Sequence, residues 1–338
     1  MTNKNDASRL RLRLKKIGLS DPAISAAWPA WWSADAEAST SARADLRFSL
    51  ARKLGLDPLS LLEDDQAPRF VWRDDARFKH LSGESEIELS AITSFGTALG
   101  TVLVASAPQF ISIAESTAGD LRKLLLGKSY PYIRLHNLLS LCWSLGIPVV
   151  HLRVFPWPQK RMAAMTVRVG DRCAILLGKD AVYPAHIAFY LAHELGHIAL
   201  GHLSSDRVIV DLEEANPKLG TDDVEEMSAD RFALELLTGE PEVVVLPSKK
   251  RYVARELARI AMTTGEQLGI EPGTLALCFG YSTGNWPVAN AALKHIYSAP
   301  KPVWKEVNDV AWTQLALDSI PDDCTEYLRA VLGEGGSL

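Results

Sequence analysis

The sequence predicts an α+β fold: a mostly helical, multidomain chain around one small β-sheet. Strand-like runs are confined to residues 147–154, 162–169 and 172–177, where apolar and β-branched side chains cluster. Elsewhere apolar residues recur at helical spacing, most clearly in the apolar segment 184–200. A few strands grouped in one region, with helices before and after them, are typical of α+β rather than all-β chains.

Length and composition describe an ordinary globular chain. With 338 residues, 47% of them hydrophobic and 23% charged, it is long enough for two or three domains with sizeable cores. The net charge of −5 excludes a chain that binds polyanions over its whole surface. The first 63 residues carry ten Lys and Arg against seven Asp and Glu, so positive charge is concentrated there.

Composition and periodicity predict four parts. They are a helical domain at 1–64, a linker and helical segment at 65–117, an α+β core at 118–245 and a C-terminal helical domain at 246–338. The charged stretch 64–85 indicates a surface loop, and 203–221 a long connection. The most apolar run, 95–107, is too short to cross a bilayer, so we expect a buried helix and no membrane span.

The first domain resembles a degenerate repressor-type helix-turn-helix. Residues 43–62 are similar to its last two helices, and Gly18-Leu19-Ser20 is similar to the entry to its second helix. Pro29 and the neighbouring tryptophans stand where a reading helix should be, and proline breaks helices. The basic side chains of this domain either contact DNA phosphates or form a solvated helix face: Arg9, Arg11, Arg13, Lys15 and Lys16.

Residues 193–197, His-Glu-Leu-Gly-His, lie within the apolar segment and give the strongest chemical signal. Pro184 suits the first turn of a helix, and Gly201 its end. Two histidines four residues apart lie on one helix face, where both can bind one tetrahedral metal ion, most often zinc. Glu194 lies between them, where it can act on a metal-bound water as a general base. The alternative is a pair of core histidines bonded to backbone carbonyls.

A third ligand is expected downstream. His202 is one position too early for the extended motif with a third histidine, and Leu200 replaces the glycine that this motif requires. We expect His202 to make a helix-end hydrogen bond or a hydrogen bond to a ligand. Glu226 is the better candidate, because Asp222 and Glu225 predict a capping box that opens a helix and leaves Glu226 free.

Glu226 begins a helical stripe in which two carboxylates stand among apolar residues. Its members are Glu226, Ala229, Asp230, Ala233, Leu234 and Leu237. Buried carboxylates need partners, so we expect Glu226 to bind the metal and Asp230 to accept the remaining N–H of a ligating histidine. The alanines would let the two helices approach closely. The alternative is an amphipathic helix with two stray acids.

Together these motifs resemble those of the ImmA/IrrE-type zinc metallopeptidases. The matching residues, within 120–240, are His193-Glu194-Leu195-Gly196-His197 and Glu226-x-x-Ala229-Asp230-x-Phe232-Ala233-x-x-Leu236-Leu237. Asp230 stands where asparagine is commoner in this family, although aspartate is usual in other glutamate-ligand zinc peptidases. The resemblance implies a zincin-like core, a Zn²⁺ cofactor and a cytosolic peptidase that inactivates a partner repressor in a stress or mobile-element response.

The expected ligand set has chemical consequences. Three protein ligands leave a fourth position for water, as in catalytic rather than structural zinc sites. Glu194 would take a proton from that water and later protonate the leaving amine. An oxyanion donor is also needed, and Tyr190, His202 and Tyr281 are the candidates. The predicted strands either accept a peptide by strand addition or form an ordinary core hairpin around Gly170-Asp171.

Cysteine usage and the first residues predict a cytoplasmic protein. The four cysteines show no pairing motif, and free thiols suit a reducing cytosol. The start of the chain has no apolar signal core. Cys278 either approaches the metal or, as we favour, is a buried core thiol.

Three classes of function are compatible with the sequence. The first is a zinc endopeptidase acting on a regulatory protein, a helix-turn-helix repressor. The second is a transcriptional regulator that binds DNA through residues 1–64 and uses the zincin-like domain as a sensor or partner platform. The third is a non-catalytic antitoxin or scaffold that keeps the metal site for stability. Metal content tests the third, and cleavage dependent on Glu194 tests the first.

Overall fold

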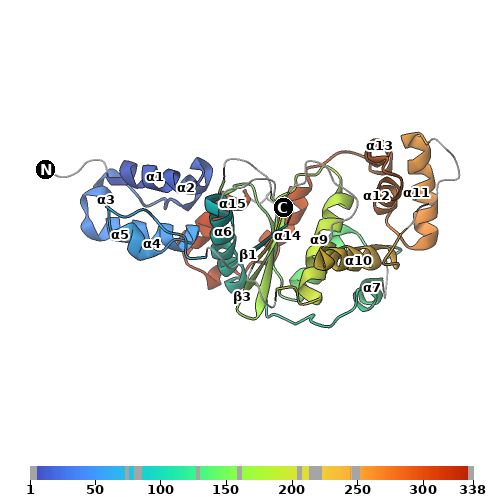
Figure 1. The fold of residues 1–338 in the computed structure, drawn as a ribbon, viewed down its shortest axis with the longest axis horizontal. Helices are drawn as coiled ribbons and strands as arrows, with labels where there is room; N and C mark the ends of the chain where they lie inside the picture. Colours follow the sequence, from blue (N-terminus) through green and yellow to red (C-terminus); the bar gives the residue numbers. More distant parts are fainter. Residues whose placement is uncertain are drawn as a thin grey trace.

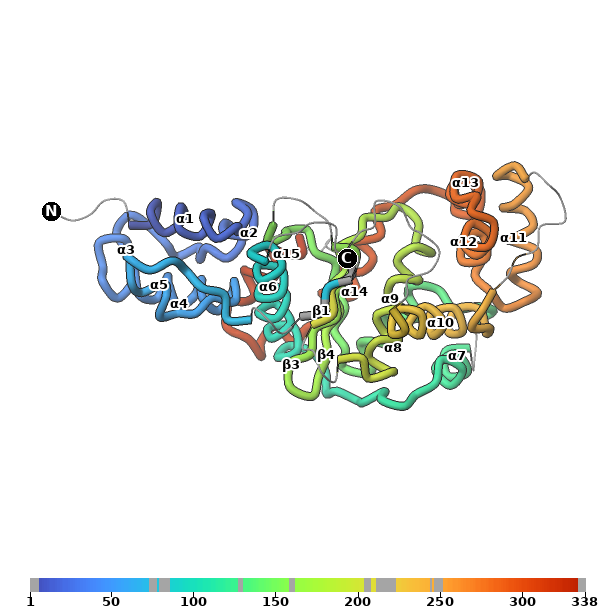
Figure 2. Tube along the Cα trace, in the orientation of Figure 1, coloured from blue at the N-terminus to red at the C-terminus, as the bar shows by residue number. Residues whose placement is uncertain are grey.

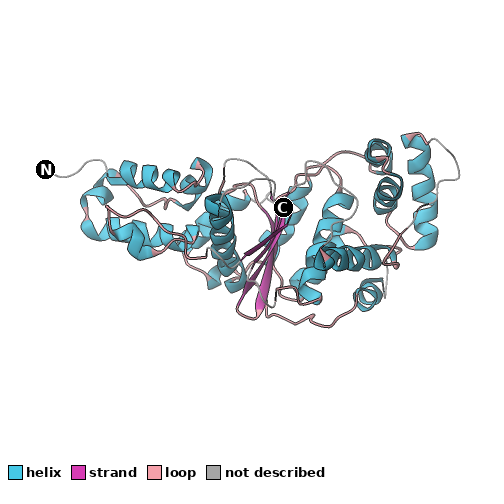
Figure 3. Ribbon diagram, viewed as in Figure 1, coloured by secondary structure: helices cyan, strands magenta, loops and turns pink. Residues whose placement is uncertain are grey.

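A computed structural model describes residues 6–72, 76–79, 86–126, 130–157, 162–203, 208–212, 223–243, 245 and 252–333. It confirms the α+β class, because helices dominate and the strands form one mixed sheet. The molecule is elongated, with the N-terminal helices at one end, the sheet near the middle and a group of C-terminal helices at the other end (Figure 1). Helices flank the sheet on both sides (Figure 3).

The described part of the sheet has five strands: β1 (Ala76–Lys79), β2 (Val149–His151), β3 (Met162–Val169), β4 (Arg172–Leu177) and β5 (Val208–Leu212). Their order is β1-β5-β3-β4-β2. β3 pairs antiparallel with β4 and β5, whereas the outer pairs β1–β5 and β2–β4 are parallel. The predicted hairpin is confirmed, since Val169 pairs with Arg172 around Gly170. β3 is therefore the central strand, with bonded neighbours on both sides.

Alternate residues of a strand point to opposite faces of the sheet, and different helices cover the two faces. α6 (Glu86–Ala105) covers one face, where its apolar core includes Met165 of β3. α8 (Leu135–Ser144) and α9 (Pro184–Ala199) belong to the core on the other face, which includes Ala164. The histidine motif of α9 therefore lies on the face opposite to α6.

α6 approaches β3 closely, because two of its glycines face the strand. A Cβ at Gly96 would lie 2.2 Å from the Sδ of Met165, and one at Gly100 would lie 3.1 Å from a methyl carbon of Val167. α6 is also long and apolar enough to cross a membrane, but 72% of its most apolar window is buried within the structure. Such burial is typical of a core helix, so the buried helix predicted for this run is confirmed.

The N-terminal unit consists of five helices: α1 (Asp6–Lys16), α2 (Asp21–Ala27), α3 (Ala34–Ala38), α4 (Thr40–Leu54) and α5 (Pro58–Leu62). Gly55 ends α4 in the left-handed region, with φ of 69°, where other residues are strained. A Cβ there would lie 2.3 Å from the carbonyl oxygen of Ser94 on α6. Leu46 and Leu50 of α4 share one apolar core with α6. The N-terminal unit is thus packed directly against α6.

The remaining helices are α7 (Ala118–Leu126), α10 (Val224–Thr238), α11 (Ala254–Leu268), α12 (Pro272–Thr283), α13 (Trp286–Ile296), α14 (Val303–Gln314), the 3₁₀ helix η1 (Leu317–Ser319) and α15 (Asp322–Leu332). α11–α13 have their own apolar cluster. α14 and α15 return to the middle of the molecule (Figure 2). There Val307 joins the core of α8 and α9, and Tyr327 joins the core of the N-terminal unit.

These cores cross the domain boundaries predicted from the sequence. The range 246–338 contributes to all three apolar clusters, and the range 1–64 shares its core with α6 and α15. Domain division requires that few contacts cross a boundary. The division into four parts therefore stays a prediction from sequence composition, because one apolar cluster contains residues of all four parts.

Two short strands lie where the sequence predicts loops. β1 falls within 64–85, the predicted surface loop, and β5 falls within 203–221, the predicted connection. Each is held by pairing, β1 with β5 and β5 with β3, and strand formation depends more on such neighbours than on local propensity. Conversely, only 149–151 of the predicted strand 147–154 pairs with β4. The connecting residues 204–207 and 213–222 lie outside the described residues.

Candidate metal centre

α9 carries both motif histidines into the interior of the protein. Pro184 occupies its first turn, and its central residues are buried against the sheet and α8. His193 and His197 are 5% and 0% exposed. Their Nε2 atoms lie 3.0 Å apart, and their ring planes are inclined by 77°. The two imidazoles therefore converge on one point.

α10 brings the predicted carboxylate to α9. The helix begins after Asp223, whose side chain accepts a hydrogen bond from the backbone N–H of Glu225. The cap is therefore Asp223; the predicted capping residue, Asp222, lies outside the described residues. Glu226 then stands in the first turn, where its side chain is 3% exposed.

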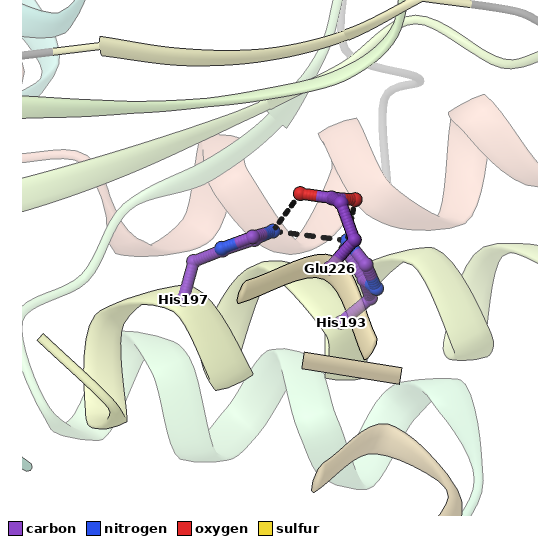
Figure 4. Close-up of side chains that lie close together, drawn as sticks. All are labelled: His193, His197 and Glu226. Carbon is purple, nitrogen blue, oxygen red and sulfur yellow. Dashed lines mark hydrogen bonds and ion pairs between the residues drawn. The ribbon is translucent and has the colours of Figure 1, made fainter. Parts of the chain in front are cut away.

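The carboxylate of Glu226 lies at the convergence point of the imidazoles (Figure 4). Its Oε2 is 3.4 Å from the Nε2 of His193, and its Oε1 is 3.4 Å from the Nε2 of His197. The helices approach closely here, because a Cβ at Gly196 would lie only 3.2 Å from the Cα of Ala229. The predicted close approach of α9 and α10 is therefore confirmed.

Asp230 orients the first histidine. Its Oδ1 lies 2.9 Å from the Nδ1 of His193. A carboxylate oxygen accepts, so Nδ1 of His193 donates this bond, and a neutral imidazole then has its lone pair on Nε2. That lone pair faces Glu226 and His197. The predicted hydrogen bond between Asp230 and a motif histidine is thus present.

A second chain of hydrogen bonds orients the other histidine. The Nδ1 of His197 lies 2.8 Å from the Nδ1 of His202, and the Nε2 of His202 lies 3.3 Å from the hydroxyl of Ser228. That hydroxyl donates to the carbonyl oxygen of Glu225. The whole chain is satisfied when His197 donates to His202 and His202 donates to Ser228. His202 therefore contacts a motif histidine, as predicted, and Ser228 is a partner that sequence reasoning missed.

Those proton positions leave three electron pairs facing one another. The Nε2 lone pairs of His193 and His197 and the carboxylate of Glu226 form a buried cluster whose donor atoms all lie within 4.8 Å. Ligand atoms of a tetrahedral site with bonds of about 2.0–2.1 Å are about 3.3–3.4 Å apart. The observed separations of 3.0, 3.4 and 3.4 Å, of which the last two involve different oxygens of Glu226, are close to that value. These three residues can hold a metal ion.

Glu194 lies beside this cluster but outside it. The side chain is fully buried, and its Oε2 accepts a hydrogen bond of 2.5 Å from the hydroxyl of Thr166 on β3. The cluster of donor atoms does not include Glu194. Thr166 was missed from the sequence, although a lone hydroxyl in the apolar run Met162–Val169 is a signal that a partner is needed.

The predicted oxyanion donors are spread around the centre. His202 uses both ring nitrogens in the chain of hydrogen bonds to His197 and Ser228, which leaves it no N–H for a substrate. Tyr281, at the end of α12, is 44% exposed. Partial burial and the charges of Asp230 and Glu242 raise its pKa, so its phenol stays a neutral donor. Tyr190 is half-buried on α9.

The cysteines have no part in the cluster. All four are free thiols, as predicted, and all four are buried, as was expected of Cys278. Burial raises the pKa of Cys278 to about 12, which keeps this thiol protonated and poorly suited to bind metal. Cys278 is therefore a core residue of α12.

Four of the five basic residues singled out in the N-terminal unit have partners within it, and the fifth, Lys16, is exposed. Arg13 donates to three carbonyl oxygens at and after α5. Arg11 stacks on Trp28, 3.9 Å from the ring centroid, and Lys15 pairs with Asp21 at 2.6 Å. α3, which follows the tryptophans, has five residues, of which two are acidic. These positions therefore contribute to packing of the unit itself.

Comparisons with protein-family models, with curated proteins and with solved structures found no match.

Proposed function

We propose that this chain is a zinc-dependent endopeptidase with a zincin-like core. His193, His197 and Glu226 bind the ion, and Glu194 is the general base. The observation that carries the proposal is the convergence of three buried donors, with a second buried carboxylate, that of Glu194, held by Thr166 outside their cluster. A structural zinc site closes with a fourth protein ligand, whereas the donors found among the described residues number three.

The residues of the chain divide the chemistry between them. Zinc, when bound, supplies Lewis acidity and lowers the pKa of a water to about 7. Glu194 accepts a proton from the attacking water and returns it to the leaving amine. Asp230 and His202 hold the motif histidines with their Nε2 atoms facing the ion. Burial of the site strengthens each of these electrostatic interactions.

A regulatory protein, specifically a helix-turn-helix repressor, is the substrate that we propose from the resemblance of the two motifs. Both long edges of the β3–β4 hairpin are already occupied by β5 and β2. The described sheet ends at β1 and β2, so strand addition would use one of these edge strands. The buried free thiols support a cytoplasmic location.

The DNA-binding alternative rests on the N-terminal unit. Arg13, Arg11 and Lys15 are engaged with carbonyl oxygens, with Trp28 and with Asp21 of the same unit. A reading helix would need free basic or amide side chains directed at the groove. We therefore add no second function to the peptidase proposal.

The test is cleavage of a degenerate peptide library by the zinc-loaded chain, with fragments identified by mass spectrometry. We expect Glu194→Gln to keep its zinc, measured by elemental analysis, and to lose cleavage by at least about a hundredfold, as removal of a general base does. His197→Ala is expected to lose zinc and cleavage together. Cleavage by Glu194→Gln at the wild-type rate would contradict the proposal, as would the absence of any cleavage by the wild-type chain.

A further inference from the structure

Thr166 is a single hydroxyl on an apolar face of the sheet. It occupies the middle of β3, where its partners across the strands are Ile175 on β4 and Ile209 on β5. Both isoleucines belong to the core that packs against α9. Thr166 itself is fully buried. A buried hydroxyl costs free energy unless it is hydrogen-bonded, and valine has almost the same shape without that cost.

The hydroxyl of Thr166 has a charged partner. It donates to the Oε2 of Glu194 over 2.5 Å, which is the short distance expected of a hydrogen bond to a carboxylate. Both side chains are shielded from water. The bond crosses from the central strand to α9 and spans 28 residues of sequence. The presence of threonine rather than valine at this position is therefore explained by Glu194.

The strand that carries Thr166 is held in place at both of its edges and on its opposite face. β3 is hydrogen-bonded to strands along both of its edges. On the opposite face, the residues before and after Thr166, Met165 and Val167, are in contact with the glycine positions Gly96 and Gly100 of α6. Thr166 therefore has little freedom to follow a moving side chain, and Glu194 must keep its orientation to keep the bond.

We propose that Thr166 is a positioning residue, which holds Glu194 as a base beside the three ligands and prevents it from becoming a fourth ligand. The inference rests on the proposed peptidase function. Glu194 follows His193 directly on α9, and it is absent from the donor cluster in the bonded geometry. A buried carboxylate released next to a dication would turn towards that charge. The open position needed for water would then be filled.

The test compares Thr166→Val with Thr166→Ser in the full-length chain loaded with cobalt(II), whose visible absorption depends on the number and type of its ligands. We expect Thr166→Val to change the cobalt spectrum. We also expect it to lower kcat on a library peptide by about 10- to 100-fold, the range typical of residues that support a metal site, with KM nearly unchanged. Thr166→Ser keeps the hydroxyl and should restore both the spectrum and kcat.

Thr97→Val is the matched control. Thr97 is also a buried hydroxyl, and it donates to the carbonyl oxygen of Thr93 within α6, away from Glu194. This control should lose stability without any change in the cobalt spectrum. A wild-type spectrum for Thr166→Val would overturn the inference. Cleavage that persists in Glu194→Gln would instead overturn the peptidase function, while the cobalt spectra would still decide whether Thr166 holds Glu194 away from the metal.

Discussion

The two faces of the central strand β3 have different tasks. Towards α6, Met165 and Val167 meet glycine backbone, and the contacts are apolar. Towards α9, Thr166 meets a buried carboxylate. Consecutive residues of one strand therefore alternate between packing and polar support, because successive side chains point to opposite faces. The difference teaches that the packing of β3 on α6 and the polar support of the metal centre can be changed separately by mutation.

The largest effect is expected from removing a ligand on the α9 side. Glu226→Ala should raise the Kd for zinc roughly a thousandfold, since one of three ligands accounts for about a third of a binding free energy of about 10–16 kcal/mol. Titration in competition with a chelator measures this constant. Glu225→Ala removes a carboxylate one position away and should change Kd by less than about threefold. Equal losses in the two variants would mean that local charge, rather than ligation, binds the ion.

The next largest effect is expected from a substitution that disturbs the packing of α6 on β3. Gly96→Val would place a β-branched side chain on the Sδ of Met165, so we expect a loss of about 1–3 kcal/mol in the free energy of unfolding. Urea unfolding of the metal-free chain measures it. Gly119→Val on α7 is the control: a Cβ there would lie 3.2 Å from the end of the Glu235 side chain and 3.9 Å from the hydroxyl of Thr117, so it should cost less. The zinc Kd of folded Gly96→Val should match wild type; a large loss of zinc affinity would show that the two faces are coupled.

A smaller effect on zinc affinity is expected from removing the hydrogen-bond partners of the two histidines. Asp230→Ala and His202→Ala should each raise the zinc Kd about 10- to 100-fold, because each removes the group that fixes an imidazole. The effect of Asp230 should be the larger, since a carboxylate is the stronger acceptor. Ser228→Ala acts through His202 and should have the smallest effect of the three. Wild-type affinity in all three variants would rule out the proton positions that we infer.

The residues of this centre that could be predicted from the sequence are those placed by local helical spacing, and the one that was missed depends on a contact between distant parts of the chain. His193, His197 and Glu226 could be predicted, because helical spacing alone places them on buried faces of two helices. Asp230 followed from the same stripe. Thr166 could not be chosen, since its bond to Glu194 joins residues that are 28 apart in sequence, with all of β4 between them, and local spacing does not fix such a contact.

The fold divides in the same way. The boundaries of β3 and β4 were predicted correctly, because their apolar runs and turn residues are local signals. β1 and β5 were missed, because charged or short segments become strands only where a partner offers a free edge. The shared core of the N-terminal unit, α6 and α15 was also missed, since contacts such as the bond from Tyr327 to the carbonyl oxygen of Lys53 join the two ends of the chain.

The smallest effect is expected where α15 packs against α4 of the N-terminal unit, and it depends on pH. Burial alone would raise the pKa of Asp323 on α15, but Lys53 and Arg52 of α4 outweigh it and hold the pKa below its usual value. Asp323 therefore stabilises the folded chain above its unfolded pKa, and this stability is lost as pH falls through the lower folded pKa. The free energies of unfolding of wild type and Asp323→Asn should differ by less than about 1 kcal/mol at pH 6, and the difference should disappear once the pH has fallen below the lowered pKa of Asp323. A difference that persists in acid would contradict this assignment.

The burial of the ligands has a kinetic consequence. The side chains that would hold the ion are 0–5% exposed, so water, substrate and chelator can reach it only at the open fourth position. A bound peptide would then shield the ion, and release of the ion to a chelator should slow as the substrate concentration rises.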